Sequence, residues 1–318
     1  MVSKVAGEPG RDQQRFRGVL SEEPEQLLRG VGWRAIWAVG QEAVLRLWDD
    51  DAMGLAGNIA FRALLAVFPF LIFATSLTAL IADQAMADGL VTFLIALVPS
   101  ALVEPLVAEA RDVLSVPRSG VLSLGGLLTL WFALGGVGAV RVGLNRAYDI
   151  RERRSAVVLL ALEVLSVVLL GLAFVVVGYL LVLAPRAGSS LHRLLPGFAP
   201  GSLELGIVRY LLSLAFLAAA LSAAHVFLPA RRLSFTTMWP GIVVTVGAWS
   251  ALGAAFSFYL SRFADYASYY AGLAGVVAGL YFLYLAALVL IFGGELNRVL
   301  RIRRLARALR PTEERLAG

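Results

Sequence analysis

Six stretches of mostly apolar residues, each about 20 residues long or longer, constrain this 318-residue chain more than any other feature. A helix needs about 20 such residues to cross the hydrocarbon core of a bilayer, where it satisfies its own backbone hydrogen bonds. The sequence therefore predicts an all-α fold, a polytopic membrane helix bundle with six transmembrane helices. The predicted spans lie within a transmembrane domain of residues 55–296 and cover residues 55–81, 121–140, 156–184, 207–228, 235–260 and 272–292.

The composition also favours a protein embedded in a membrane. Apolar residues make up 59% of the chain and charged residues 16%, and the mean hydropathy is +0.79. Soluble domains contain about 45–50% apolar and about 25% charged residues. A soluble chain with this surplus of hydrophobic side chains would lack the polar side chains needed to cover its surface.

Residues 82–120 are predicted to form an external helical segment that lies on the outer interface of the membrane. The apolar run at 90–98 within it is short, and Pro99, Glu104 and Pro105 follow it. Two prolines and a glutamate within so few turns are poorly tolerated in a spanning helix. A short packed connector without a function of its own is the alternative for this segment.

Basic residues predict the orientation of the six spans. Of the 26 Lys and Arg outside them, 21 lie on the side that holds both termini and the loops at 141–155 and 229–234. The positive-inside rule makes that side cytoplasmic. We therefore expect a multi-pass protein with cytoplasmic N and C termini.

The two cytoplasmic ends differ in character. Residues 1–30 are polar and are predicted to form a flexible tail, whereas residues 31–54 are predicted to form an interfacial amphipathic helix, because tryptophan favours the headgroup layer. Residues 297–318 form a basic tail that we expect to contact anionic membrane lipid, and we expect no nucleic-acid partner. One face of the amphipathic helix collects Trp33, Ile36, Trp37, Val44, Leu47 and Trp48.

Polar and charged side chains inside the spans are the candidate functional residues, because each charge there costs about 2.5–3.5 kcal/mol on insertion scales. In the predicted topology most of them fall in the cytoplasmic half of the bundle, where they would form a polar vestibule open to the cytoplasm. We expect Arg62 or Arg141 to pair with Glu163 or Glu295. For Arg141 the alternative is snorkelling to the interface. The candidate vestibule comprises Asn58, Arg62, Arg141, Glu163, His225, Glu295 and Asn297.

Glycine and proline mark where the spans approach one another or bend. Glycines crowd the second span, and Gly275 and Gly279 lie one turn apart in the sixth. Small residues allow close helix packing, and a sliding surface for alternating access is the alternative. Pro69 and Pro240 are predicted to kink the first and fifth spans. The glycine-rich faces permit a homo-oligomer without requiring one.

The chain is poor in the residues that most enzymes use. It contains no cysteine, and its two histidines are His192 and His225. We therefore expect no catalytic residues, no metal site and no cofactor. The sequence predicts a protein that is not an enzyme.

Seven short motifs stand out in the sequence: Leu55–Phe61, Phe68-Pro69, Leu144–Tyr148, Trp239-Pro240-Gly241, Phe256–Leu260, Tyr270–Gly275 and Gly293–Asn297. Together they resemble the YihY/virulence factor BrkB family of six-span bacterial inner-membrane proteins. The resemblance covers roughly residues 45–300 and implies the fold and a location in the bacterial plasma (inner) membrane. Arg62, Phe282 and Gly294 depart from the family pattern.

Members of that family have also carried a ribonuclease label, which the residues of this chain do not favour. Metal-dependent RNA cleavage needs clustered His, Asp or Glu ligands, and the membrane-embedded acids are Glu163 and Glu295. Two classes of function remain. One is a transporter or a translocator of lipid or another amphiphile, and the other is a non-transporting membrane scaffold or envelope-integrity factor.

Overall fold

The computed structural model describes residues 33–81, 119–171, 202–231, 233–267 and 273–317, and every regular element in these residues is a helix. A helix lies over each of the six predicted spans, so the fold is an all-α helical bundle. The helices are α3 (Trp33–Asp49), α4 (Ala52–Ile81), α7 (Ser119–Ala147), a helix at Ala156–Gly171, α9 (Ser202–Phe227), α10 (Phe235–Ala267) and α11 (Leu273–Ala317).

Four stretches of these helices are long and apolar enough to cross a membrane: Leu124–Ala147, Tyr210–Phe227, Phe235–Tyr259 and Gly275–Ala306. Ala52–Val67 and Ala156–Gly171 are shorter apolar helices. The predicted tail at 1–30 and the predicted external segment, apart from its last two residues, lie outside the described residues.

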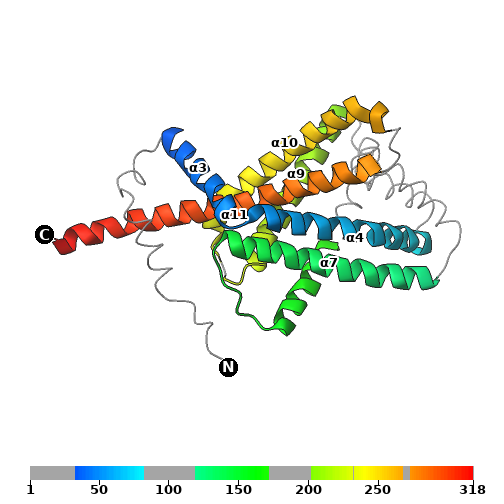
Figure 1. Ribbon diagram of the computed structural model, residues 1–318, viewed down its shortest axis with the longest axis horizontal. Helices are drawn as coiled ribbons and strands as arrows, with labels where there is room; N and C mark the ends of the chain where they lie inside the picture. Colours follow the sequence, from blue (N-terminus) through cyan, green and yellow to red (C-terminus); the bar gives the residue numbers. More distant parts are fainter. Residues whose placement is uncertain (1–32, 82–118, 172–201, 232, 268–272, 318) are drawn as a thin grey trace, which may run out of the picture.

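The long helices lie side by side, and α11 extends past the others toward the C-terminus (Figure 1). One end of the bundle brings together the α3–α4 turn, the ends of α7 and α9, and the middle of α11. Ion pairs and hydrogen bonds of Arg146, Arg154 and Arg298 connect these segments. We call this end, with Arg231 and Arg301 included, the arginine pole.

The surface of the bundle is apolar and its interior holds polar side chains. Val157 is 78% exposed and Trp131 is 74% exposed, whereas His225, Glu295 and Asn297 are fully buried. Soluble proteins show the opposite distribution. Surrounding lipid accounts for the apolar surface, because it solvates such side chains without cost.

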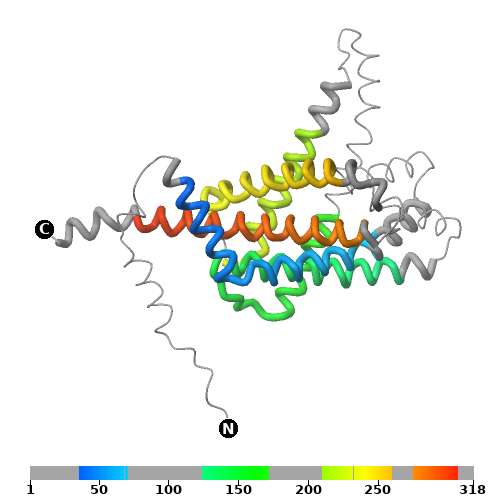
Figure 2. The backbone as a smooth tube through the Cα atoms, turned by 45° about the horizontal axis from the view of Figure 1, so that its top comes forward, coloured from blue at the N-terminus to red at the C-terminus, as the bar shows by residue number. Residues whose placement is uncertain are grey.

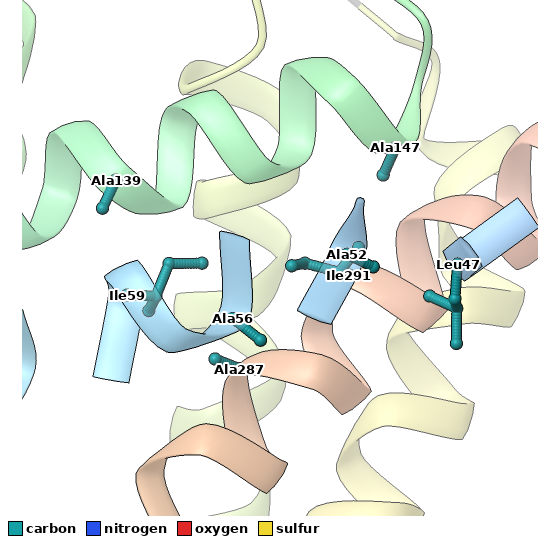
Figure 3. Close-up of a cluster of buried hydrophobic side chains, with 8 residues drawn as sticks. All are labelled: Leu47, Ala52, Ala56, Ile59, Ala139, Ala147, Ala287 and Ile291. Carbon is teal, nitrogen blue, oxygen red and sulfur yellow. The ribbon is translucent and has the colours of Figure 1, made fainter. Parts of the chain in front are cut away.

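Small side chains bring α4 and α7 together. Ala52, Ala56 and Ile59 recur at helical spacing on α4 and pack against Ala139 and Ala147 of α7 (Figure 3). Alanine lets two helix backbones approach closely, which favours association in lipid through van der Waals contact.

α10 and α11 cross even more closely, at a pair of glycines. A methyl group added to Gly241 would collide with the carbonyl oxygen of Gly293, and one added to Gly293 would collide with the hydroxyl of Thr245. Pro240 lies inside α10 directly before this crossing, and α10 continues through it. α4 likewise continues through Pro69.

Side chains of α11 bind the backbone of α10 around Pro240. Proline has no N–H, so it leaves the carbonyl of Thr236 without its helical donor. Arg304 Nη1 donates to that carbonyl at 3.0 Å, while Asn297 accepts from Gly241 N–H at 2.7 Å and donates to the Met238 carbonyl at 2.9 Å. α11 therefore stabilises the interrupted part of α10 from outside.

The predicted interfacial helix at 31–54 is divided in the structure. α3 ends at Asp49 and α4 begins at Ala52, with Asp51 in the left-handed backbone region at φ 54°. Val39 and Ala43 of α3 pack against α11, which α3 crosses (Figure 2). Of the predicted apolar face, Leu47 is buried in the bundle, whereas Ile36, Trp37, Val44 and Trp48 are exposed.

The crossing of α10 and α11 makes a prediction about Gly241. Gly241→Ala should destabilise the protein by about 1–3 kcal/mol, because overpacking forces backbone or side-chain shifts. Gly247→Ala on the same helix is the matched control, since a methyl group there meets no atom within 4 Å. Thermal unfolding of the detergent-solubilised full chain measures both. Equal melting temperatures for the two variants would contradict the close crossing.

Candidate functional site

Arg141 of α7 and Glu163 of the helix at Ala156–Gly171 form an ion pair between apolar helices. Arg141 Nη2 lies 3.2 Å from Glu163 Oε1, and the two side chains are 12% and 15% exposed. Gly138 makes room for this carboxylate, because a methyl group there would lie 2.9 Å from Glu163 Oε1. The structure thus contains one of the ion pairs that the sequence predicts.

Glu152 extends this pair into the loop after α7. Its carboxylate accepts hydrogen bonds from Arg141 Nη1 at 3.0 Å, Asn145 Nδ2 at 3.1 Å and Arg154 Nη2 at 2.8 Å. The bond from Arg154 is the main reason that the pKa of Glu152 falls from 4.5 to about 2. Arg154 also donates to the carbonyl of Leu228 at 2.7 Å, so the network ties α7 to the end of α9.

A second cluster lies in the buried interior and joins α7, α9, α10 and α11. The Tyr148 hydroxyl and His225 Nδ1 lie 2.6 Å apart, and Asn297 Nδ2 donates to the same hydroxyl at 3.0 Å. Asn297 also makes the bonds to α10 described above. His225 Nε2 has no hydrogen-bond partner within the described residues. The full burial of these side chains indicates a role in fixing the helices relative to one another.

A third cluster surrounds Arg298 at the arginine pole. Arg298 Nη1 lies 2.8 Å from Asp50 Oδ2, and Nη2 lies 2.9 Å from Asp149 Oδ2. Glu295 is fully buried beside it, 3.7 Å from Arg298 Nη1, and neither of its carboxylate oxygens has a hydrogen bond to a described residue. Arg146 also pairs with Asp50 at 3.3 Å, so Asp50 links three helices.

Arg62 of α4 stands apart from these clusters. Its Nε donates to the side-chain oxygen of Asn58 at 2.9 Å, on the exposed surface of the helix. A methyl group at Gly135 of α7 would lie 2.7 Å from Arg62 Nη1, so the guanidinium covers this glycine. No carboxylate pairs with Arg62 in the part of the chain that the structure describes.

The seven candidate residues thus fall into separate groups rather than one connected set. Asn58 contacts Arg62, Arg141 contacts Glu163, and Tyr148 connects His225 to Asn297. Glu295 belongs to the Arg298 cluster. The residues that link these groups were not predicted as site residues from the sequence, and they are Asp50, Asn145, Tyr148, Glu152, Arg154 and Arg298. Acidic residues interspersed in the arginine-rich loop at 146–154 are the signal that could have indicated Glu152.

Together, the apolar bundle surface and the polar interior define a helical integral membrane protein. The family described as Virulence factor BrkB matches residues 43–316, and the chain belongs to this family. The chain is also similar to a protein of Bacillus subtilis (strain 168), YfkH, which is named as ribonuclease-like. The two are 30% identical over 268 residues, which cover 83% of this chain and 95% of that protein. No solved structure matches the chain.

The Arg141–Glu163 pair predicts a measurable coupling. Arg141→Gln and Glu163→Gln should each destabilise the protein, and the double variant should lose less than the sum by about 0.5–3 kcal/mol. Arg141→Gln should cost more than Glu163→Gln, because Glu152 also loses a donor. Arg141→Gln combined with Glu42→Gln on α3 is the additive control. If the stability losses of Arg141→Gln and Glu163→Gln simply added in the double variant, the ion pair would contribute nothing to the stability of the protein.

Glu152 predicts a dependence of stability on pH. Its pKa in the folded protein lies below the ordinary value of 4.5, so its stabilising effect is present above that value and is lost as the pH falls toward about 2. Wild type should therefore be more stable than Glu152→Gln near neutral pH, and the difference should shrink in this acidic window. A difference in melting temperature that stayed constant down to the acidic limit would contradict the lowered pKa.

Proposed function

We propose that this protein is a six-span protein of the bacterial inner membrane that moves an amphiphile, such as a lipid, across or within the bilayer. The observation that carries the proposal is Arg62, a cation on an apolar helix with only the neutral Asn58 side chain as its hydrogen-bond partner within the described residues. Ionisable residues inside spans are costly and mark substrate or ion pathways.

The depth of Arg62 supports a role within the membrane. Arg62 lies ten residues beyond Ala52, the first residue of α4, which at 1.5 Å per residue is about 15 Å along the helix. The hydrocarbon core is about 30 Å thick. Its hydrogen bond to Asn58, one turn nearer the start of α4, directs the guanidinium toward the arginine pole and so toward a headgroup that enters from that end.

The polar clusters suit an amphiphile better than a bare ion. Arg62 lies exposed at the seam between α4 and α7, where the acyl chain of a ligand can remain in lipid while its polar end meets the guanidinium. Arg141 of α7 pairs with Glu163, whose carboxylate lies beside Gly138, about one turn of α7 nearer the pole than the Gly135 that Arg62 covers. In this proposal the arginine pole faces the cytoplasm, as the positive-inside rule indicates.

Interfacial segments hold the bundle in place in the same proposal. The exposed side chains of Ile36, Trp37 and Trp48 on α3 lie in the headgroup layer. The basic continuation of α11 contacts anionic lipid. Both segments meet at an ion pair, since Arg303 Nη2 lies 2.9 Å from Glu42 Oε2.

A scaffold that transports nothing is the second candidate function. The full burial of Tyr148, His225 and Asn297 favours it, because such a network holds four helices rigidly. We propose that this protein is not an enzyme, although its relative from Bacillus subtilis is named as ribonuclease-like. Glu163 and Glu295 lie in separate clusters, and metal-dependent RNA cleavage needs its acids together.

Single cysteines test the transport proposal, because the chain contains no natural cysteine. Asn58→Cys and Arg62→Cys should react with a membrane-impermeant thiol reagent added from the cytoplasmic side. His225→Cys should stay unlabelled as the buried control, and Val168→Cys should stay unlabelled as the lipid-facing control. Asp149→Cys at the arginine pole reports that the reagent has reached this side.

A transport measurement then follows on reconstituted vesicles. Fluorescent phospholipid movement between leaflets should be faster with wild type than with Arg62→Gln at equal amounts of folded protein. Protection of positions 58 and 62 together with lipid movement equal to that of empty vesicles would overturn transport and favour the scaffold.

A further inference from the structure

Three side chains of α11 follow the first turns of α10. Asn297 binds the backbone at Met238 and Gly241, and Arg304 binds the carbonyl of Thr236. Arg301 lies four residues after Asn297 and three before Arg304, so all three share one face of α11. This face therefore brings Arg301 and Arg304 to the start of α10.

The four arginines of α11 whose side chains the structure describes divide into two kinds. Arg298 and Arg303 have acidic partners, Asp50 and Glu42. Arg304 has a carbonyl partner but no carboxylate, and Arg301 has neither a hydrogen bond nor an ion pair within the described residues. Arg231, in the connection from α9 to α10, is likewise without a described partner. The strongest charge interactions of Arg301 are repulsions from Arg231 and Arg298.

The positive charges of the arginines near the start of α10 repel one another, and a bound anion would reduce this repulsion. Tyr148 and Asp149 also act on Arg301, but Asp149 is already bound to Arg298 and is 73% exposed. Arg298 is offset by its own carboxylates, whereas Arg231, Arg301 and Arg304 have no ion pair with a carboxylate of the described residues. Guanidinium groups bind carboxylate and phosphate oxygens through two parallel hydrogen bonds, and phosphate is the group of this kind that lipid headgroups carry.

The surroundings indicate that this phosphate is carried by a lipid. The membrane-spanning stretch of α10 begins at Phe235, so the cluster lies where a span ends. Phe235 and Trp239 are 59% and 49% exposed on the first turns of the same helix. Aromatic side chains at a span end lie at the level of the lipid headgroups.

We infer that Arg231, Arg301 and Arg304 form a binding site for the phosphate of an anionic phospholipid in the leaflet at the arginine pole. The site lies at the junction of α10 and α11. Arg304 contributes its guanidinium to the site and also donates to the Thr236 carbonyl. A lipid bound there joins the α9–α10 connection to α11. The inference does not depend on whether the protein moves a substrate.

Lipid binding to the purified full chain tests the site. Delipidated protein in detergent is titrated with phosphatidylglycerol or phosphatidylcholine, and bound lipid is counted by native mass spectrometry. Arg231→Gln, Arg301→Gln and Arg304→Gln should each weaken phosphatidylglycerol binding about fivefold, as expected for one basic side chain at a membrane surface. Arg303→Gln is the matched control, because it removes one positive charge from α11 at a residue that is paired with Glu42 and lies outside the proposed site. This variant should bind phosphatidylglycerol as tightly as wild type.

Further variants separate a binding defect from a folding defect. Arg231 is exposed in a connection between helices, so Arg231→Gln should fold even if Arg301→Gln does not. Arg301→Lys keeps the charge and loses the planar fork, and it should bind phosphatidylglycerol less tightly than wild type but more tightly than Arg301→Gln. Size-exclusion profiles and melting temperatures identify the folded variants.

A titration with inorganic phosphate distinguishes the source of the ligand. Selective phosphatidylglycerol binding that the three variants weaken and Arg303→Gln does not supports the lipid site. Phosphate binding with the same sensitivity, without phosphatidylglycerol binding, supports the phosphate site but overturns the lipid as its ligand. Equal losses in Arg303→Gln and the three variants, or no loss in any of them, would overturn the site.

Discussion

The side-chain amide of Asn297 joins α11 directly to the end of α7 and to α10. It bonds to the Tyr148 hydroxyl at the end of α7 and to the backbone of α10 on both sides of Pro240. Through Tyr148 it reaches His225 of α9. A buried amide with these bonds fixes the register of four helices, because sliding any of them leaves polar groups unpaired in an apolar interior.

This arrangement follows from the apolar surface of the bundle. Helices that are apolar on their outer faces gain nothing from hiding hydrophobic side chains from lipid, so contact and hydrogen bonding must hold them together. Small residues supply the contact, as Gly241 and Gly293 do where α10 crosses α11. Polar groups supply the specificity, and they gather at the arginine pole because the charged ends of the helices meet there.

The fold could be predicted from the sequence because an apolar stretch of about 20 residues or more is compatible with few structures other than a membrane-spanning helix. The ends of the helices were harder to predict. α11 continues to Ala317 because leucine, alanine and arginine favour a helix after the apolar run has ended. The contact of α3 with α11 was not predicted, because Val39 and Ala43 are small apolar residues and the tryptophans of α3 are the stronger signal in the sequence. The choice of Arg141 over Arg62 as the partner of Glu163 depends on how α7 is rotated, which a single sequence does not specify.

The glycines of α7 separate two kinds of charge within the bundle. Gly138 accommodates a glutamate that already has a cationic partner, whereas Gly135 accommodates the guanidinium of Arg62, which has no carboxylate partner among the described residues. An anion that approaches Arg141 has to displace Glu163 or Glu152, which costs an existing ion pair. Within the described part of the chain, an anion that approaches Arg62 has to displace only the neutral amide of Asn58. Charged hydrogen bonds are stronger than neutral ones, so Arg62 is the more available of the two arginines to the headgroup of an anionic amphiphile.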